Sequence, residues 1–228
     1  MSPTRQRWFD ELVPKYRFVA DRDLDGRSLI VEIGCGKGDA TAAMAPADAP
    51  ALVVACEPNE ATCAHLASLL DARGIDNVRL WIGDAFSLLA MLGPQSVAEI
   101  RVWFPDPWPK PRQAQKRLTT PLRLALIIEA LHLGGVLRLA SDDANYAAQA
   151  FAAMQAEPRL AAAIVSRPQE RPVTVFEARG IREGHAAVDL LARRVPPEVE
   201  AHLFVAHEVQ LKNTSGALLP GLPPGKCP

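Results

Sequence analysis

The sequence has few cysteines and no long apolar run, and both absences exclude whole classes of protein. Its four cysteines among 228 residues form no C-x-x-C pair and have no histidine at zinc-finger spacing. This argues against a disulfide framework and against a structural metal. No apolar run is long enough to span a bilayer, and none follows the amino terminus. We therefore expect a cytoplasmic protein that binds neither membrane nor metal.

The sequence also lacks an excess of charge of either sign. Lys and Arg number 25 against 26 Asp and Glu, so the net charge is −1. A surface for a polyanion would therefore have to be a local patch. The length and the 49% of hydrophobic residues suit one globular domain, and they leave monomer and homodimer equally open.

Glycine is concentrated after the first apolar run. Residues 29–33 predict a buried strand that carries one acid, Glu32, and Gly34, Gly36 and Gly38 follow at alternate positions. Glycines between a strand and a helix allow positive φ and a close approach of the backbone to a ligand. The spacing is Gly-x-Gly-x-Gly, which argues against a dinucleotide cofactor.

Acidic residues end the next two predicted strands. Glu57 follows residues 52–56, about 20 positions after the glycines, where nucleoside-binding folds hold a ribose diol. Asp84 and Ala85 follow residues 78–82, a place suited to accepting from an adenine amino group. Each acid also has a simpler interpretation, because Glu57 can start a helix and Asp84 can cap one.

The pattern predicts an α/β fold with a doubly wound, mostly parallel seven-stranded sheet and a short N-terminal arm. Strands alternate with helices, and the helix at 121–132 is expected to end at Gly134. Residues 168–184 predict a rim loop rather than a helix. The predicted strands are 29–33, 52–56, 78–82, 97–103 and 136–140, with closing antiparallel strands at 187–195 and 201–211. The predicted organisation is an arm at 1–28, a domain at 29–211 and a disordered tail at 212–228.

A proline-rich segment, residues 104–110, follows the fourth predicted strand directly. Its three alternate prolines fix φ and remove N–H donors, so the segment cannot be an inner strand or a helix interior. It predicts a stiff loop that presents Asp106, Trp108 and Lys110 at the sheet edge where ligands bind. The alternative is an ordinary turn that uses Asp106 as a turn former.

The proline loop opens the most basic part of the chain. Residues 100–123 contain six basic residues and one acid. Such a run is usually a solvated face, but cations beside the aromatic Trp108 also suit phosphate contact with base stacking. A spare aspartate, Asp142 or Asp143, follows the fifth strand and is expected to face the same pocket.

Taken together, a glycine loop, a ribose acid and an adenine-side acid indicate a bound adenosine. The chain has no Gly-Lys-Ser/Thr end of a phosphate-binding loop. An adenosine ligand without a phosphate cradle indicates S-adenosylmethionine as the cofactor.

Several motifs resemble those of the single-chain bacterial tRNA (guanine-N7-)-methyltransferases, which are class I methyltransferases of Rossmann-like fold. The proline loop, Phe-Pro-Asp-Pro-Trp-Pro-Lys, is similar to the family's hallmark. The other blocks follow in the family's order, and the similarity extends from about residue 29 to 194. They are Val31 to Gly38, Glu57, Gly83 to Ala85, Ser141-Asp142, Thr174 to Gly180, and Gly184-His185.

The resemblance implies a role for particular residues in methylating N7 of a tRNA guanine, which lies in the variable loop. Asp106 would be catalytic, and it would also help to bind the cofactor. The remaining cofactor residues would be Glu32, Gly34, Gly36, Gly38, Glu57, Asp84 and Ala85. The tRNA contacts would come from Lys110, Arg112, Asp142, Thr174, Val175, Phe176 and Glu177.

Three alternatives remain at this stage: a methyltransferase for a small molecule, one for another RNA, and a tRNA-binding module without catalysis. The first would keep the glycine loop and Glu57 but would have no use for the basic segment. The last would keep the basic segment without cofactor binding.

Overall fold

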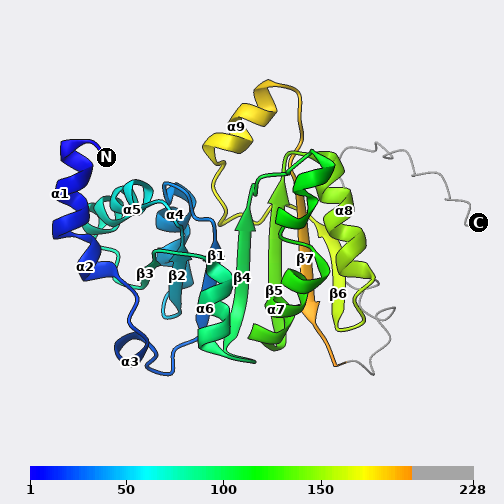
Figure 1. The fold of residues 1–228 in the computed structure, drawn as a ribbon, viewed down its shortest axis with the longest axis horizontal. Helices are drawn as coiled ribbons and strands as arrows, with labels where there is room; N and C mark the ends of the chain where they lie inside the picture. Colours follow the sequence, from blue (N-terminus) through cyan, green and yellow to red (C-terminus); the bar gives the residue numbers. More distant parts are fainter. Residues whose placement is uncertain (197–228) are drawn as a thin grey trace, which may run out of the picture.

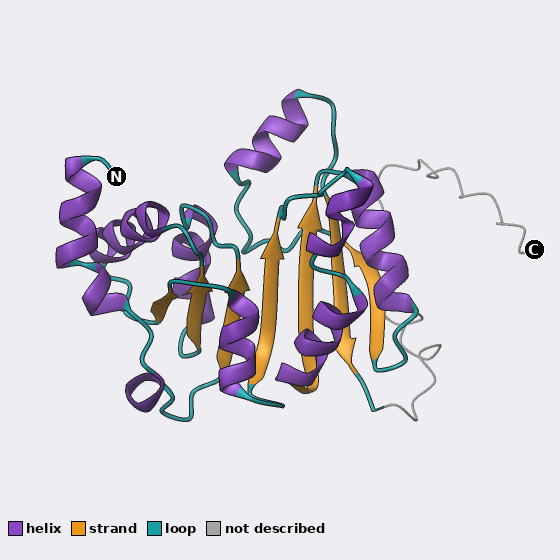
Figure 2. Ribbon diagram, viewed as in Figure 1, coloured by secondary structure: helices purple, strands orange, loops and turns teal. Residues whose placement is uncertain are grey.

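The computed structural model describes residues 1–196, which form a seven-stranded sheet with helices on both faces (Figures 1 and 2). The strand order is β3-β2-β1-β4-β5-β7-β6, and only the pairings made by β7 are antiparallel. This confirms the predicted doubly wound, mostly parallel sheet. The strands are β1 (Leu29–Ile33), β2 (Leu52–Cys56), β3 (Val78–Trp81), β4 (Val97–Trp103), β5 (Leu131–Ser141), β6 (Leu160–Val165) and β7 (Val188–Arg194).

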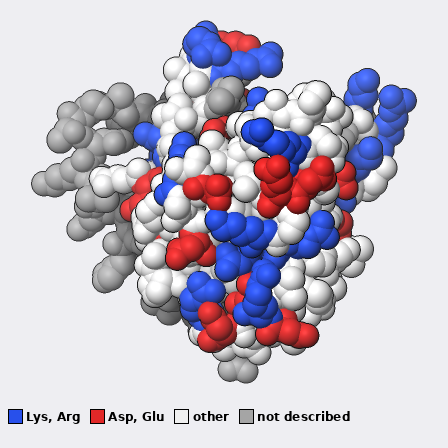
Figure 3. All heavy atoms as spheres, turned by 90° about the vertical axis from the view of Figure 1, so that its left-hand side faces the viewer, with Lys and Arg blue, Asp and Glu red and all other residues white. Residues whose placement is uncertain are grey.

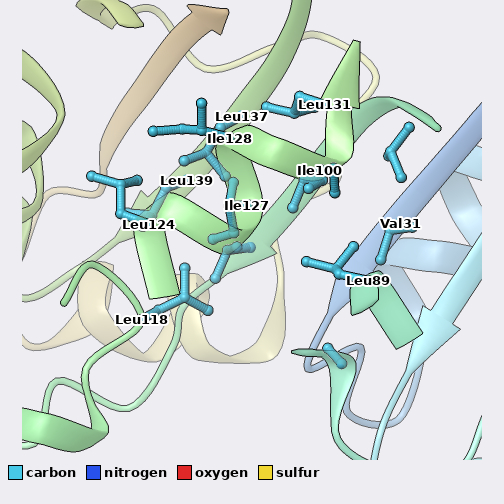
Figure 4. Packing of buried hydrophobic residues seen from close by; sticks show 14 of the residues in the cluster. Val31, Leu89, Ile100, Leu118, Leu124, Ile127, Ile128, Leu131, Leu137 and Leu139 are labelled. Carbon is cyan, nitrogen blue, oxygen red and sulfur yellow. The ribbon is translucent and has the colours of Figure 1, made fainter. Parts of the chain in front are cut away.

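Alternate residues of the inner strands point to opposite faces, so the sheet has two hydrophobic layers. Val31 and Val54 pack with α6 (Ala85–Leu92), α7 (Pro121–Ala130) and α8 (Ala144–Gln155). Figure 4 shows part of this layer, where Leu89 lies beside Val31 and Ile127 lies beside Leu139 of β5. Neighbouring strand residues, such as Ile30 and Val53, pack on the other face with α4 (Asp39–Asp48) and α5 (Glu60–Arg73).

The N-terminal segment forms three short helices. They are α1 (Pro3–Glu11), α2 (Val13–Tyr16) and α3 (Ala20–Asp23). The first two pack beside α5, and the third is linked to β3 by the ion pair of Asp23 with Arg79 at 3.0 Å. Tyr16 of α2 is buried, and Lys15 forms an ion pair with Asp71 at 2.6 Å. Basic and acidic side chains are interspersed on this face of the molecule (Figure 3), so its cations do not form a patch of one sign.

The structure corrects three details of the predicted elements. The helix at 121–132 ends at Ala130, and β5 begins at Leu131 instead of Val136, with Gly134 and Gly135 inside the strand. The pairing register with β4 shifts at this point, between Val97 and Glu99. The glycines therefore lie at an irregularity of the strand and do not end a helix.

The second correction is a helix, α9 (Val175–Arg182), inside the predicted rim loop. The third is β6, which had not been predicted; it pairs with β7 and completes the seven strands. The strand predicted at 201–211 and the tail predicted at 212–228 lie outside the described residues. No helix within residues 1–196 is long and apolar enough to cross a membrane.

The start of α4 depends on Gly38, which has φ +77° and precedes the helix. A Cβ atom there would lie 2.3 Å from Cδ1 of Leu66, a fully buried residue of α5. Gly36 also has a positive φ, +55°, but a Cβ there would meet nothing within 4 Å. Substitutions at the two glycines can therefore distinguish the cost of backbone strain from the cost of close packing.

We expect Gly38→Ala to lower the free energy of unfolding by about 3 kcal/mol, from left-handed strain plus overpacking. Gly36→Ala carries only the strain and should cost about 1 kcal/mol. Urea unfolding of both variants measures the difference. Equal losses in the two variants would contradict the role assigned to the Leu66 contact.

Candidate functional site

A cavity of about 650 Å³ lies at the carboxyl ends of β1, β2 and β4. Residues of the glycine loop, the proline loop and the start of α9 line it, although they are far apart in the sequence. In Figure 1, α9 lies beyond the arrowheads of β4 and β5, on this side of the sheet. The predicted site residues that the cavity brings together are Glu32, Gly34, Gly36, Gly38, Glu57, Asp84, Asp106 and Thr174.

The glycine loop and Glu57 hold each other in place. The Gly36 N–H donates to Oε2 of Glu57 at 3.2 Å, and the Asn59 N–H donates to Oε1 at 3.0 Å. The Gly34 N–H bonds the carbonyl of Cys56 at 2.9 Å, which ties the loop to the end of β2. The Glu57 carboxylate is thus fixed at the cavity wall with lone pairs left over to accept from ligand hydroxyls.

Glu32 is a buried carboxylate in the same wall, with 2% of its surface exposed. Burial raises its pKa to about 7, although the hydroxyl of Thr41, which donates to Oε2 at 2.9 Å, opposes the shift. A positively charged group in the cavity would favour the ionised form. This part of the cavity therefore suits a cationic ligand.

Asp84 caps a helix, as one of its two predicted roles requires, and it also lies at the cavity, as the other would require. Its Oδ2 accepts from the N–H of Ser87 at 3.0 Å and so caps α6, and the residue also lines the cavity. Ala85 is buried as the first residue of α6, and it is not among the lining residues.

The proline loop is held by two unusual backbone conformations and by an arginine. Phe104 and Trp108 have φ values of +53° and +45°, which are rare for large side chains. Arg117 donates from Nε to the Pro107 carbonyl at 3.1 Å and from Nη2 to the Trp108 carbonyl at 3.0 Å. The loop thereby keeps Asp106, whose side chain is exposed, at the cavity.

Three of the six cations of residues 100–123 have structural roles. Arg101 is buried and pairs with Asp48 and Glu99 at 2.7 and 2.6 Å. Arg117 holds the proline loop, and Arg123 donates to the carbonyl of Lys116 while covering the Phe86 ring at 5.1 Å.

The other three cations of this segment are exposed. They lie on the proline loop and on the 3₁₀ helix η1 (Pro111–Lys116), which continues it. Lys116 lines the cavity. The predicted substrate residues Lys110 and Arg112 are not among the lining residues, but in the sequence they lie between Trp108 and Lys116, which are. The three are Lys110, Arg112 and Lys116.

The helix α9 begins at the cavity and is capped by Thr174, whose Oγ1 accepts from the N–H of Glu177 at 3.1 Å. Val175 and Phe176 are its first two residues. Gly180 packs so closely on the loop after β5 that a Cβ there would lie 3.0 Å from Oδ2 of Asp142. Asp142 therefore lies under α9 and is not among the cavity lining.

A buried arginine that the sequence analysis did not single out connects α9 to the sheet. Arg171 has no exposed surface, and its guanidinium binds Glu177 at 2.7 Å and Asp189 of β7 at 2.9 Å. It also lies over the rings of Trp103 and Phe104, at 5.5 and 5.3 Å from their centroids. Burial raises the pKa of Asp189, and the neighbouring Arg171 opposes that shift.

Glu177, which is a predicted tRNA contact, has its carboxylate in this buried ion pair and is not among the residues that line the cavity. No pattern in the sequence distinguishes Arg171. The helix α9, in contrast, could have been predicted, because Thr174 and Glu177 have the spacing of a capping box. Among the described residues, no group of three or more His, Cys, Asp or Glu side chains could hold a metal ion.

The fold and this cavity define a Rossmann-like methyltransferase. A family described as "Putative methyltransferase" matches residues 26–190. The same fold occurs in the 16S rRNA (adenine(1408)-N(1))-methyltransferase of Catenulisporales acidiphilia, with a TM-score of 0.54 and 16% identity over 87% of this chain and 95% of that one.

Curated relatives define the family more narrowly. The tRNA (guanine-N(7)-)-methyltransferase of Streptomyces coelicolor is 38% identical over 75% of this chain and 65% of its own length. The enzyme of that name from Nocardia farcinica is 38% identical over 84% of this chain and 79% of its own. The chain belongs to the tRNA (guanine-N(7)-)-methyltransferase family.

The raised pKa of Glu32 predicts a pH dependence of stability without ligand. Its ordinary pKa is 4.5 and its folded value is about 7, so the folded chain binds more protons between these values. The free energy of unfolding should therefore fall as pH rises from 4.5 to 7, and the loss should persist above that. In Glu32→Gln this contribution should vanish, which urea unfolding across that pH range would detect. Curves with the same pH dependence in both proteins would contradict it.

Proposed function

We propose that this chain transfers a methyl group from S-adenosylmethionine to N7 of a guanine in tRNA, the variable-loop guanine by family resemblance. The observation that carries the proposal is that one cavity is lined by both the glycine loop with Glu57 and the proline loop with Asp106. The names of the related enzymes supply the reaction and the class of substrate.

The glycine-loop side of the cavity fits the cofactor. Glu57 would accept from the ribose hydroxyls, Asp84 from the adenine amino group, and Glu32 would favour the positive charge of the amino acid part. The open backbone at Gly34 and Gly36 lets a ligand approach closely. S-adenosylmethionine, when bound, supplies an electrophilic methyl group on a sulfonium.

Asp106 would orient the acceptor and would not remove a proton. Guanine N7 carries an in-plane lone pair and no proton, so its methylation needs no general base. The base must leave its stack to reach the cavity. An exposed carboxylate on a stiff loop can accept from the N–H groups of guanine and align N7, and alignment supplies most of the acceleration.

The exposed cations at the rim would bind the tRNA backbone. Lys110 and Arg112 are the exposed predicted contacts, and Thr174 lines the cavity beside Asp106. Because the rest of the chain is close to neutral, this small group would supply the phosphate contacts. Val175 and Phe176 follow Thr174 and remain proposed contacts.

Asp106→Ala should reduce methyl transfer by about 100-fold, because the aligned acceptor is lost. The affinity for S-adenosylmethionine should stay near that of the unchanged protein. Transfer of a labelled methyl group to tRNA, with mapping of 7-methylguanosine, measures the first, and calorimetry measures the second. Glu57→Gln is the matched control, which should weaken cofactor binding instead. Full activity of Asp106→Ala would refute the orienting role.

Lys110→Gln and Arg112→Gln should each reduce the slope of log K for tRNA binding against log salt by about one. Arg73→Gln is the control, since this exposed arginine ends α5, which runs away from the cavity edge of the sheet. Filter binding of tRNA at several salt concentrations gives the slopes. If all three variants behave alike, the phosphate contacts lie elsewhere.

A further inference from the structure

Trp108 presents one face of its indole to a cation at the cavity. The ammonium of Lys116 lies 4.6 Å from the ring centroid, and both residues line the cavity with Asp106. Trp108 is half-buried, whereas Lys116 is exposed. Trp is the aromatic side chain that attracts a cation most strongly over its face. The ring therefore already serves as a site for positive charge.

The backbone under this ring is fixed. Trp108 has the left-handed φ of +45°, and Arg117 binds both its carbonyl and that of Pro107. A strained conformation of a large residue persists only where its surroundings impose it, and such residues concentrate at ligand sites. The indole is thus a preorganised surface and not a side chain on a mobile loop.

Lys116 differs from its neighbours Arg117 and Arg123, whose guanidinium groups are held by backbone carbonyls. Among residues 1–196 its ammonium makes no hydrogen bond or ion pair. Arg123 also covers an aromatic ring, that of Phe86, but its guanidinium is fixed by the carbonyls of Lys116 and Arg117. A ligand can displace Lys116 from Trp108 without breaking the loop.

The proposed reaction creates a cation next to this surface. Guanine N7 gives its lone pair to the methyl carbon as the carbon–sulfur bond breaks, and sulfur keeps that electron pair. One positive charge therefore moves from sulfur to the purine, and no proton is transferred. A purine that gains charge is attracted more strongly by an aromatic face than neutral guanine is.

We infer that the exposed face of Trp108 is the stacking subsite for the target purine, that it favours the methylated, cationic form, and that Lys116 competes for it. This inference rests on the proposed function and adds a residue to it. Lys116 occupies the face before the base enters and returns to it when the product leaves. By competing for the ring, Lys116 promotes release of the methylated product, which the subsite would otherwise bind tightly.

The test compares binding of 7-methylguanosine 5′-monophosphate and guanosine 5′-monophosphate by calorimetry, without cofactor or tRNA. The unchanged protein should bind the methylated nucleotide roughly fivefold more tightly. Trp108→Leu should lose this preference, and Trp108→Phe should keep part of it. Circular dichroism and thermal unfolding establish that each variant is folded. No preference in the unchanged protein, or a full preference in Trp108→Leu, would overturn the subsite.

Lys116→Met tests the competition. It should raise the affinity for the methylated nucleotide about threefold, because no cation then covers the ring. Lys15→Met is the matched control, since Lys15 also covers a ring, that of Tyr16 at 5.1 Å, but lies on α2. Unchanged affinity in Lys116→Met would overturn the competition.

The inference and the proposed function fail in different ways. If tRNA receives no methyl group while the nucleotide preference remains, the function is wrong and the subsite stands. If tRNA is methylated at guanine N7 and Trp108→Leu keeps the preference, the function stands and the subsite is wrong.

Discussion

The side of the cavity formed by the proline loop and α9 depends on one buried charge, the guanidinium of Arg171. A charge without access to water is stable only when it is paired and hydrogen-bonded, and Arg171 meets this condition with Glu177 and Asp189. These partners belong to α9 and to β7, so the ion pairs fix the helix over the end of the sheet. Because the same guanidinium covers Trp103 and Phe104, it also fixes the point where the proline loop leaves β4.

The need to satisfy polar groups also explains where the basic residues of the proline loop and η1 lie. A loop with three prolines has few N–H donors to hold its shape, and its carbonyls need donors from elsewhere. Arg117 supplies them to Pro107 and Trp108, and it is therefore occupied in keeping the loop in place. Part of the most basic segment of the chain therefore stabilises the structure, whereas Lys110, Arg112 and Lys116 are exposed.

The sequence was informative where the relevant pattern is local. The glycines, Glu57 and Asp106 follow strands directly, and the carboxyl ends of parallel strands share one edge, so their proximity could be predicted. Arg171 could not be predicted, because its partner Asp189 lies on a strand 18 residues further along and only the folded sheet brings them together. The alanine-rich β6 shows no alternation of polar and apolar residues and was missed for that reason.

The charges around the cavity agree with the chemistry of methyl transfer to a lone pair. Glu32, Glu57 and Asp84 line the glycine-loop side, and Asp106 lines the proline-loop side. A positive charge that crosses from sulfur to a purine would therefore meet a carboxylate or an aromatic face at both ends. Such a site lowers the energy of the charge after transfer as well as before it, and it can do so without a proton acceptor. This is the physical reason for assigning Asp106 and Trp108 to orientation and charge stabilisation instead of acid–base chemistry.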